Sequence, residues 1–164
     1  MDRAWRDFTA WYAAEAPRVL LTLRAALGDD TRASDAADEA FARAYALWHR
    51  VSRMESPAGW VYVVALNHAR SELRRASRER MHADRHPVAV TVPGPEPDGP
   101  VWQALRTLSP RARLAVALRY LADLPEAEVA RLMGVTRGTV ATTLHRARAE
   151  LADRLASQRE EEIR

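Results

Sequence analysis

The sequence predicts an all-α protein with two small helical domains joined by a flexible linker. Alanine, leucine and arginine are abundant in the chain of 164 residues, and this mixture favours helix over sheet. Apolar residues recur at helical spacing on both sides of a proline-rich stretch, while no segment of any length alternates as a strand does. The length suffices for one domain or two small ones.

The proline-rich stretch sets the domain organisation. Residues 86–100, HPVAVTVPGPEPDGP, contain five of the nine prolines and two of the six glycines. Proline removes amide donors and disfavours helix in the residue before it, so we expect extended, poorly ordered chain here, VAVTV included. The predicted parts are a domain over 1–82, a linker over 83–100, a domain over 101–159 and a tail over 160–164.

Three helices are predicted in the first domain. Apolar spacing from Phe8 to Leu27 predicts the first, which ends at the glycine of LGDD. Ser34 or Asp35 is expected to cap the second. After a loop, Ser56 caps a third that opens at Pro57 and runs to about Met81. The apolar faces are Ala37, Ala40, Phe41, Ala44, Tyr45 and Trp48 in the second helix, and Val61, Val64, Ala65, Ala69, Leu73 and Ala76 in the third.

Four helices are predicted in the second domain. They cover 101–107, a segment opened by Ser109-Pro110, residues 124–134, and a long stretch from Val135 that Thr136 caps. The inward residues are Leu114, Leu118 and Leu121 in the second of these, and Val140, Leu144, Ala147, Leu151 and Leu155 in the last.

The turn at Gly134 carries the clearest motif. Ala130 is small enough to let two helices cross closely, Gly134 can take the positive φ of a tight turn, and Val140 packs the second helix on the first. This pattern favours a DNA-binding helix-turn-helix over an ordinary helical hairpin.

The charges point to a polyanionic partner. All 25 basic residues are arginine, and the net charge is +3. Residues 67–86 contain six arginines and three acidic residues, and residues 101–159 contain ten arginines and five acidic residues. The stretch between these two blocks is acidic. Two basic blocks fit a nucleic acid held at two places, or two solvated helical faces.

Three faces carry candidate binding residues. The last helix turns outward Arg137, Thr139, Thr142, Thr143, His145, Arg146 and Arg148, which suit contacts to bases and phosphates. A second face holds Asn67, Arg70, Ser71, Arg74 and Arg78, preceded by Trp60 and Tyr62, and suits single-stranded DNA, with core aromatics as the alternative. Asp35, Asp38 and Glu39 suit either a helix dipole, if they lie in a first turn, or a basic partner protein.

Catalysis and membrane insertion find no support. The chain has no cysteine, its five histidines are scattered, and it has no glycine-rich phosphate loop. We therefore expect no enzyme activity, no cofactor and no metal. The charged N-terminus and the lack of a long apolar run lead us to expect a cytoplasmic protein without a signal peptide or membrane span.

Taken in this order, the segments resemble a small, two-domain extracytoplasmic-function sigma factor, a group of the sigma-70 family of bacterial RNA polymerase sigma factors. ASDAADEAFARAY resembles the region 2 segment that docks on the β′ clamp helices, and SPAGWVYVVALNHARSELRRASRER the part that melts and reads the −10 element. LSPRARLAVALRYLADLPEAEVARLMGVTRGTVATTLHRARAEL resembles region 4, which reads the −35 element and contacts the β flap; GTV followed by LHRAR is its most specific part.

The resemblance implies roles for individual residues. Core polymerase would be bound by Asp35, Asp38 and Glu39. The −10 DNA would be bound by Trp60, Asn67, Arg70, Ser71, Arg74 and Arg75, with Asn67 recognising a flipped base. The −35 duplex would be bound by Arg137, Thr139, Thr142, His145 and Arg146. Polymerase would supply the chemistry, and an anti-sigma factor is a further partner that the resemblance allows.

The sequence also departs from the family's pattern. Ser34 and Asp38 stand where the docking segment usually has Glu and Gln, and Ala141, Thr142 and Thr143 stand where basic, Ser and basic residues usually follow GTV. We expect weaker or altered −35 reading, since each lost phosphate contact flattens the salt dependence by about one unit of slope. The alternatives left open are a stand-alone helix-turn-helix regulator that binds duplex DNA, and a decoy that holds polymerase or an anti-sigma factor.

Overall fold

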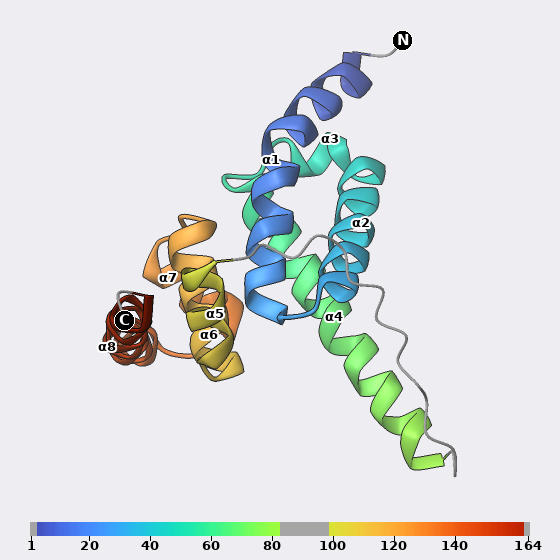
Figure 1. Cartoon of the computed structure of the whole chain (residues 1–164). Coiled ribbons are helices and arrows are strands. Elements are labelled where there is room, and N and C mark those ends of the chain that lie inside the picture. Colours follow the sequence, from blue (N-terminus) through green and yellow to red (C-terminus); the bar gives the residue numbers. More distant parts are fainter. Residues whose placement is uncertain (1–2, 83–98, 163–164) are drawn as a thin grey trace. The chain divides into compact units, whose positions relative to one another are not determined.

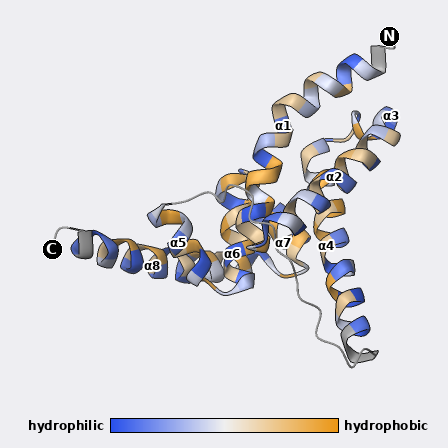
Figure 2. Cartoon of the chain, turned by 45° about the vertical axis from the view of Figure 1, so that its right-hand side comes forward, coloured by the Kyte–Doolittle hydropathy of each residue, from blue (hydrophilic) through white to orange (hydrophobic). Residues whose placement is uncertain are grey.

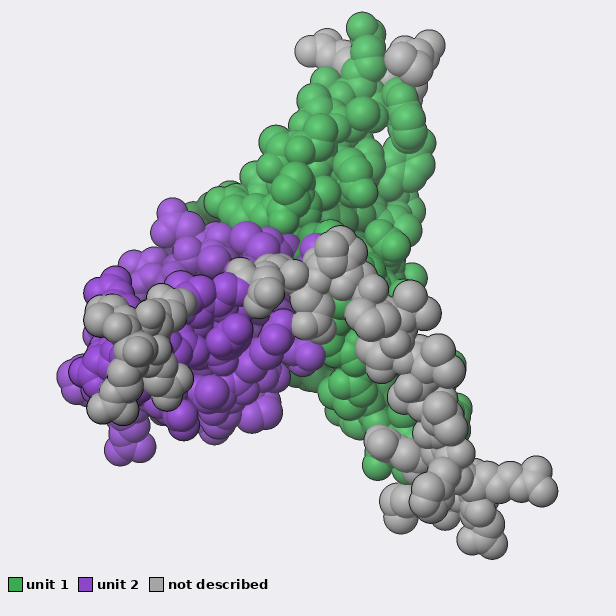
Figure 3. Space-filling model, viewed as in Figure 1, with its two compact units in different colours: residues 1–20, 29–94 green, residues 21–28, 95–164 purple. Residues whose placement is uncertain are grey.

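The computed structural model describes residues 3–82 and 99–162, and every regular element in these ranges is a helix (Figure 1). The predicted all-α fold is confirmed. Residues 83–98, which hold nearly all of the expected linker, lie outside the described ranges. Within those ranges no helix is long and apolar enough to cross a bilayer. The chain divides into two compact units, residues 1–20 with 29–94 and residues 21–28 with 95–164 (Figure 3).

Unit 1 is built around the packing of two helices rich in alanine. It holds most of α1 (Arg3–Leu27), then α2 (Asp30–Ala46), the short α3 (Trp48–Val51) and α4 (Pro57–His82), with α2 packed along α4. Small side chains allow this close packing because the helix backbones can approach each other. The buried residues of the two helices are Ala33, Ala36, Ala37, Ala40, Phe41 and Ala44 on α2, and Val61, Tyr62, Ala65, Leu66 and Ala69 on α4.

The start of α2 corrects one prediction. Gly28 has a φ of +65° and ends α1, and the Asp29 side chain then accepts a hydrogen bond from the Arg32 amide at 3.0 Å. The N-cap is therefore Asp29, and the expectation that Ser34 or Asp35 caps this helix is wrong. The physical reason is that LGDD supplies both a left-handed stop and a capping carboxylate, so the next helix begins at once.

Aromatic side chains extend the unit 1 core toward the N-terminal part of α1. Phe8 lies 5.1 Å from Tyr45 and 5.3 Å from Trp48, centroid to centroid. Tyr45 stays half exposed and Trp48 half-buried, so these two predicted core residues pack by their edges. The loop expected after α2 begins with the short helix α3.

The third helix of unit 1 begins as predicted and then leaves the core. Ser56 accepts a hydrogen bond from the Gly59 amide at 3.0 Å, and Pro57 is the first residue of α4. Burial ends at Ala69, and Leu73, expected on the apolar face, is 38% exposed. Helical spacing alone cannot show where the neighbouring helices end, which is why the predicted face was too long.

Besides the end of α1, the described part of unit 2 contains four α-helices and one π-helical segment. They are α5 (Pro100–Thr107), α6 (Pro110–Val116), the π-helix η1 (Ala117–Leu121), α7 (Glu126–Met133) and α8 (Arg137–Glu162). Helices α5, α6 and α7 all pack against α8. Ser109 caps α6 as predicted, but the helix widens to η1 over its last turn, which the spacing of Leu114, Leu118 and Leu121 did not predict.

The buried face of α8 confirms the predicted helix-turn-helix core. Val140, Leu144 and Ala147 are at most 2% exposed, and Val129 and Ala130 of α7 are buried with them. Leu151 and Leu155, further along the predicted stripe, are half-buried. Helix α7 starts at Glu126 and not at Leu124, because Pro125 takes an extended conformation and serves as its N-cap.

The turn between α7 and α8 is closed by main-chain hydrogen bonds. Gly134 has a φ of +66°, its amide donates to the Arg131 carbonyl at 3.3 Å, and the Val135 amide donates to the Ala130 carbonyl at 3.0 Å. These two bonds form the Schellman arrangement that ends a helix on a left-handed residue. Thr136 then caps α8 as predicted, accepting from the Thr139 amide at 3.2 Å.

We expect Gly134→Ala to destabilise the protein by about 1 kcal/mol, because an L side chain is strained at this φ although the space around its Cβ is open. Gly138→Ala is the matched control. Gly138 lies in the first turn of α8 with its nearest neighbour atom 4.0 Å from an added Cβ, so alanine should raise stability by about 0.5 kcal/mol. Urea unfolding followed by circular dichroism measures both changes, and equal effects would contradict the role of the turn.

Candidate nucleic-acid interface

Helix α8 presents the predicted residues on the side opposite its core face. Arg137, Thr142, His145 and Arg146 are exposed and Thr139 is half-buried, while Val140 and Leu144 face α7 and the rest of the unit. A helix anchored on one side, with arginine and threonine on the other, is the arrangement by which a recognition helix reaches base edges in a major groove.

The threonine hydroxyls of α8 are hydrogen-bonded within the helix itself. Thr142 Oγ1 donates to the Gly138 carbonyl at 3.0 Å, and Thr143 Oγ1 donates to the Thr139 carbonyl at 2.7 Å. Thr139 and Thr136 share a hydrogen bond between their hydroxyl oxygens at 2.8 Å. These bonds satisfy the threonine hydroxyls locally, within the helix and its cap.

The arginines of this face are available for anions. Arg137 Nε lies 3.7 Å from Glu126 Oε2, a long and exposed ion pair of the kind that contributes little. Arg146 forms no ion pair with any residue that the structure describes, and its side chain is exposed. Both guanidinium groups can therefore turn to phosphates or guanine edges at low cost.

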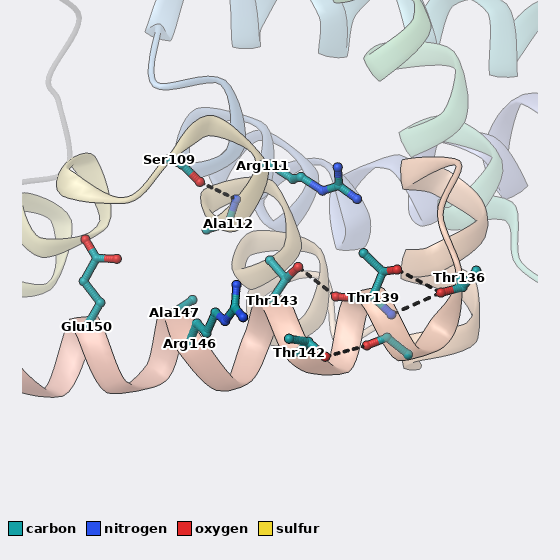
Figure 4. A pocket seen from close by; sticks show the side chains of 11 residues that line it. Ser109, Arg111, Ala112, Thr136, Thr139, Thr142, Thr143, Arg146, Ala147 and Glu150 are labelled. Atoms are coloured by element: carbon teal, nitrogen blue, oxygen red, sulfur yellow. Dashed lines mark hydrogen bonds between the residues drawn. The ribbon is translucent and has the colours of Figure 1, made fainter.

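A groove of mixed polar and apolar lining runs beside this face. It has a volume of about 770 Å³, and Figure 4 shows the row of threonines on α8 with Arg111 and Ser109 near the start of α6. Arg111 is exposed. Sequence reasoning missed Arg111 and Ser109, because helical spacing places them correctly on α6 but does not show that α6 lies against α8. The side chains that line it are those of Ser109, Arg111, Ala112, Thr136, Thr139, Thr142, Thr143, Arg146, Ala147 and Glu150, with Gly138.

The second half of α4 forms a hydrophilic face in unit 1 (Figure 2). Asn67, Arg70, Ser71, Arg74 and Arg75 are all exposed there. Arg70 Nη1 lies 3.5 Å from Asn67 Oδ1, which is a weak contact. The face therefore brings together cations and an amide, as the sequence predicted.

The arginines of α4 differ in their partners. Arg75 lies between two carboxylates, 3.8 Å from Glu72 and 3.3 Å from Glu79. Arg74 has no ion pair among the residues of the described ranges, and its carbonyl accepts from Arg78 Nε at 3.3 Å. Arg74 is therefore the freer cation of the pair.

The two aromatic residues that precede this face differ in exposure. Tyr62 is 1% exposed and belongs to the core, so the expectation that it stacks on bases is wrong. Its neighbours at helical spacing, Val61, Ala65 and Leu66, are buried too. Trp60 is half-buried and keeps one part of its ring accessible.

Asp35 and Asp38 of α2 are not placed for the helix dipole. Because α2 begins at Asp30, Asp35 and Asp38 lie in the second and third turns, and the dipole effect falls off within the first. Both are exposed, and neither forms an ion pair within the described ranges. Glu39 is engaged by Arg43 Nε at 2.5 Å. Two uncompensated carboxylates on an exposed helix face suit a basic partner surface.

Comparison with known proteins identifies two family regions in the chain. Residues 11–79 match the family Sigma-70 region 2, and residues 99–151 match the family Sigma-70, region 4. The chain is 26% identical over 156 residues to the RNA polymerase sigma-E factor of Streptomyces coelicolor, covering 93% of this chain and 88% of that protein. An alignment of 171 positions with the ECF RNA polymerase sigma factor SigE of Mycolicibacterium smegmatis shows 29% identity. It covers 96% of this chain and 64% of that protein.

A solved structure shares the fold. The sigma factor RpoE of Bartonella quintana, determined in complex with the anti-sigma factor NepR, matches with a TM-score of 0.74 at 21% identity, covering 92% of this chain and 98% of that one. The two family matches lie on the two helical regions that carry the candidate faces, in the order of the sequence. The chain belongs to the sigma-70 family of RNA polymerase sigma factors and is an extracytoplasmic-function member of it.

Proposed function

We propose that this sigma factor binds core RNA polymerase through α2, captures the −10 element on α4 and reads the −35 element with α8. The observation that carries the proposal is the exposed face of α8, anchored by a helix-turn-helix core and lined by arginine and threonine. As a sigma factor the chain directs transcription initiation, and the residue roles below are our assignment. The stand-alone regulator is not favoured, because the family matches include region 2 as well as the helix-turn-helix.

Docking on polymerase falls to the acidic face of α2. Asp35 and Asp38 would meet basic residues of the β′ clamp helices, and Glu39, already paired with Arg43, would contribute less. Region 4 would contact the β flap, and the segment over 83–100 would connect the two domains. The bounds 1–82 and 101–159 remain our proposal for the domains.

Capture of the −10 element falls to α4. Asn67 would hydrogen-bond to the edge of an unstacked base, Trp60 would supply an aromatic surface, and Arg70, Ser71, Arg74 and Arg75 would hold the backbone. Binding of unpaired bases favours the open state of the duplex by mass action, so no catalytic group of the sigma factor is needed. We expect the chain to have no enzyme activity of its own.

The two neighbouring arginines of α4 give a first test of this assignment. We expect Arg74→Ala to lower the salt slope of binding to −10 single-stranded DNA by about 0.7, the value for one lost phosphate contact on a single strand. Arg75→Ala should lower the slope by less, because the neighbouring carboxylates of Glu72 and Glu79 already offset part of the charge of Arg75. Holoenzyme binding to a labelled non-template oligonucleotide, titrated from about 50 to about 200 mM salt, measures both slopes. Equal loss in the two variants would contradict the distinction.

A further partner and a cellular location follow from the family. The relative RpoE was solved with the anti-sigma factor NepR. We propose that an anti-sigma factor also regulates this chain, and that the chain works in the cytoplasm, where bacterial polymerase acts. Capture of the tagged chain from its own bacterium, followed by competition with core polymerase, tests this, since an anti-sigma factor should be displaced by core polymerase.

Run-off transcription tests the function as a whole. The purified chain and core polymerase from the source bacterium are mixed with fragmented genomic DNA, and the 5′ ends of the RNA are sequenced. We expect new 5′ ends that share spaced −35 and −10 elements. Binding to polymerase without new starts would favour a decoy. Failure to bind polymerase would overturn the proposal.

A further inference from the structure

Threonine on a recognition helix can offer a base three groups: a hydroxyl donor, a hydroxyl acceptor and a methyl. On the exposed side of α8, the hydroxyl donor of Thr142 already makes a hydrogen bond. Thr142 Oγ1 gives its proton to the Gly138 carbonyl at 3.0 Å, as the dashed line in Figure 4 shows. The next threonine, Thr143, makes the same bond but is half-buried, so Thr142 is the one placed to meet a base.

The bond to the preceding turn decides which group faces outward. A β-branched side chain has few staggered positions in a helix, and when the oxygen is held by the carbonyl four residues back, the methyl takes another position. Thr142 then has a free methyl group and the two acceptor lone pairs of its hydroxyl oxygen. It has no free proton to donate unless the bond to Gly138 breaks.

The base pairs of a duplex differ in what they offer to such a side chain. In the major groove a guanine shows only acceptors, N7 and O6, which cannot accept from a hydroxyl whose proton is already given. An A·T pair shows the thymine 5-methyl group and the adenine N6 amino donor. The cytosine of a G·C pair also shows an amino donor, N4, that an oxygen lone pair can accept from, so for this side chain the thymine 5-methyl alone distinguishes an A·T pair.

We infer that Thr142 selects an A·T pair in the −35 element through contact between its methyl group and the thymine 5-methyl. This inference rests on the proposed function of α8. The neighbouring Arg146, one turn on and free of ion pairs in the described chain, is the residue suited to an adjacent guanine or phosphate. Thr142, which stands where the family usually has Ser after GTV, thus changes what is read by adding a methyl group at that position.

The experiment removes one methyl group at a time. The −35 duplex comes from a start site mapped by run-off transcription, and each thymine in it is replaced singly by uracil, which lacks only the 5-methyl. We expect uracil at one position to weaken holoenzyme binding about three- to fivefold, the effect of one methyl contact. Uracil at the other positions should have little effect.

Two substitutions assign that effect to Thr142. Thr142→Ser keeps the hydroxyl and removes the methyl, so it should bind the thymine and uracil duplexes equally. Thr142→Val keeps a methyl and removes the hydroxyl, so it should retain the preference for thymine. Thr9→Ser and Thr9→Val are matched controls, because Thr9 is an exposed threonine on α1 with the same bond, to the Trp5 carbonyl at 2.8 Å. Neither should change the preference.

The outcomes separate this inference from the function on which it rests. Tight binding with no thymine preference at any position would overturn the inference and leave the function standing. An unchanged preference in Thr142→Ser would also overturn it, because the methyl contact would then belong to another residue. Binding and transcription that do not depend on the −35 sequence at all would overturn the proposed role of α8 and the inference together.

Discussion

Charge reversal of the acidic face, Asp35→Arg with Asp38→Arg, is expected to weaken binding to core RNA polymerase by about 100-fold, since like charges brought together at an interface cost several kcal/mol. Transcription from the mapped promoters should fall in parallel. Both side chains are exposed and unpaired in the described chain, so the unfolding free energy should change by no more than about 0.5 kcal/mol. Fluorescence titration of labelled sigma factor with core enzyme, without DNA, measures the affinity.

The matched control reverses two acids with the same spacing elsewhere. Glu150 and Asp153 are exposed on α8 and three residues apart, as Asp35 and Asp38 are on α2. The variant Glu150→Arg with Asp153→Arg changes the net charge equally, so it should bind core polymerase nearly as the parent does. If both double variants lost affinity equally, the effect would be one of net charge, and the α2 face would not be the docking site.

Much of the fold followed from local sequence signals. Ser56-Pro57, Ser109-Pro110 and Gly134 mark helix ends by side-chain chemistry that acts within four residues, and the structure places helix ends at all three. The buried stripe of Val140, Leu144 and Ala147 follows from periodicity alone. These features could be predicted because each depends on a short stretch of chain.

The wrong predictions concern features that one short stretch of sequence does not determine by itself, such as burial and the choice between two capping residues. Leu73 has a core position in the helical repeat but is 38% exposed, and Tyr62 is buried although it stands close to the charged face. The cap of α2 was placed too late because Ser34 and Asp35 are good capping residues in isolation, whereas Asp29 stands nearer to the glycine stop. Where two residues could cap the same helix, the one that directly follows the preceding helix stop becomes the N-cap.

For the candidate binding faces, too, the outward positions could be predicted from the sequence, whereas the contacts of individual side chains could not. The sequence predicted which residues of α4 and α8 face outward, since that needs only the helical repeat. It did not predict that Arg111 of α6 lines a groove with the threonines of α8, or that Glu72 and Glu79 engage Arg75 while Arg74 stays free. The assignment of individual contacts to DNA and polymerase remains a prediction for the experiments above.

Leu144→Ala is expected to lower the stability of unit 2 by about 3 kcal/mol, because Leu144 is 2% exposed and its loss leaves a cavity between α8 and the helices packed on it. Small domains have a total stability of only about 5 kcal/mol, so a substantial population would be unfolded under mild denaturant. Leu73→Ala is the control: the same atoms are removed at a site 38% exposed, where about 0.5 kcal/mol is expected. Urea unfolding by circular dichroism gives both values.

The functional consequence of Leu144→Ala tests whether the two units act as separate modules. Leu144 faces the core and touches no DNA in the proposed arrangement. Its loss should therefore reduce binding to the −35 duplex in the mild denaturant that unfolds unit 2, since the recognition face exists only while α8 is packed. Binding to core polymerase through Asp35 and Asp38 should fall much less, because those residues stand on α2, whose packing against α4 lies within unit 1. Parallel titrations with core enzyme and with −35 duplex separate the two effects. Equal loss of both activities would mean that folding of the two units is coupled, and that polymerase docking depends on the helix-turn-helix as much as DNA reading does.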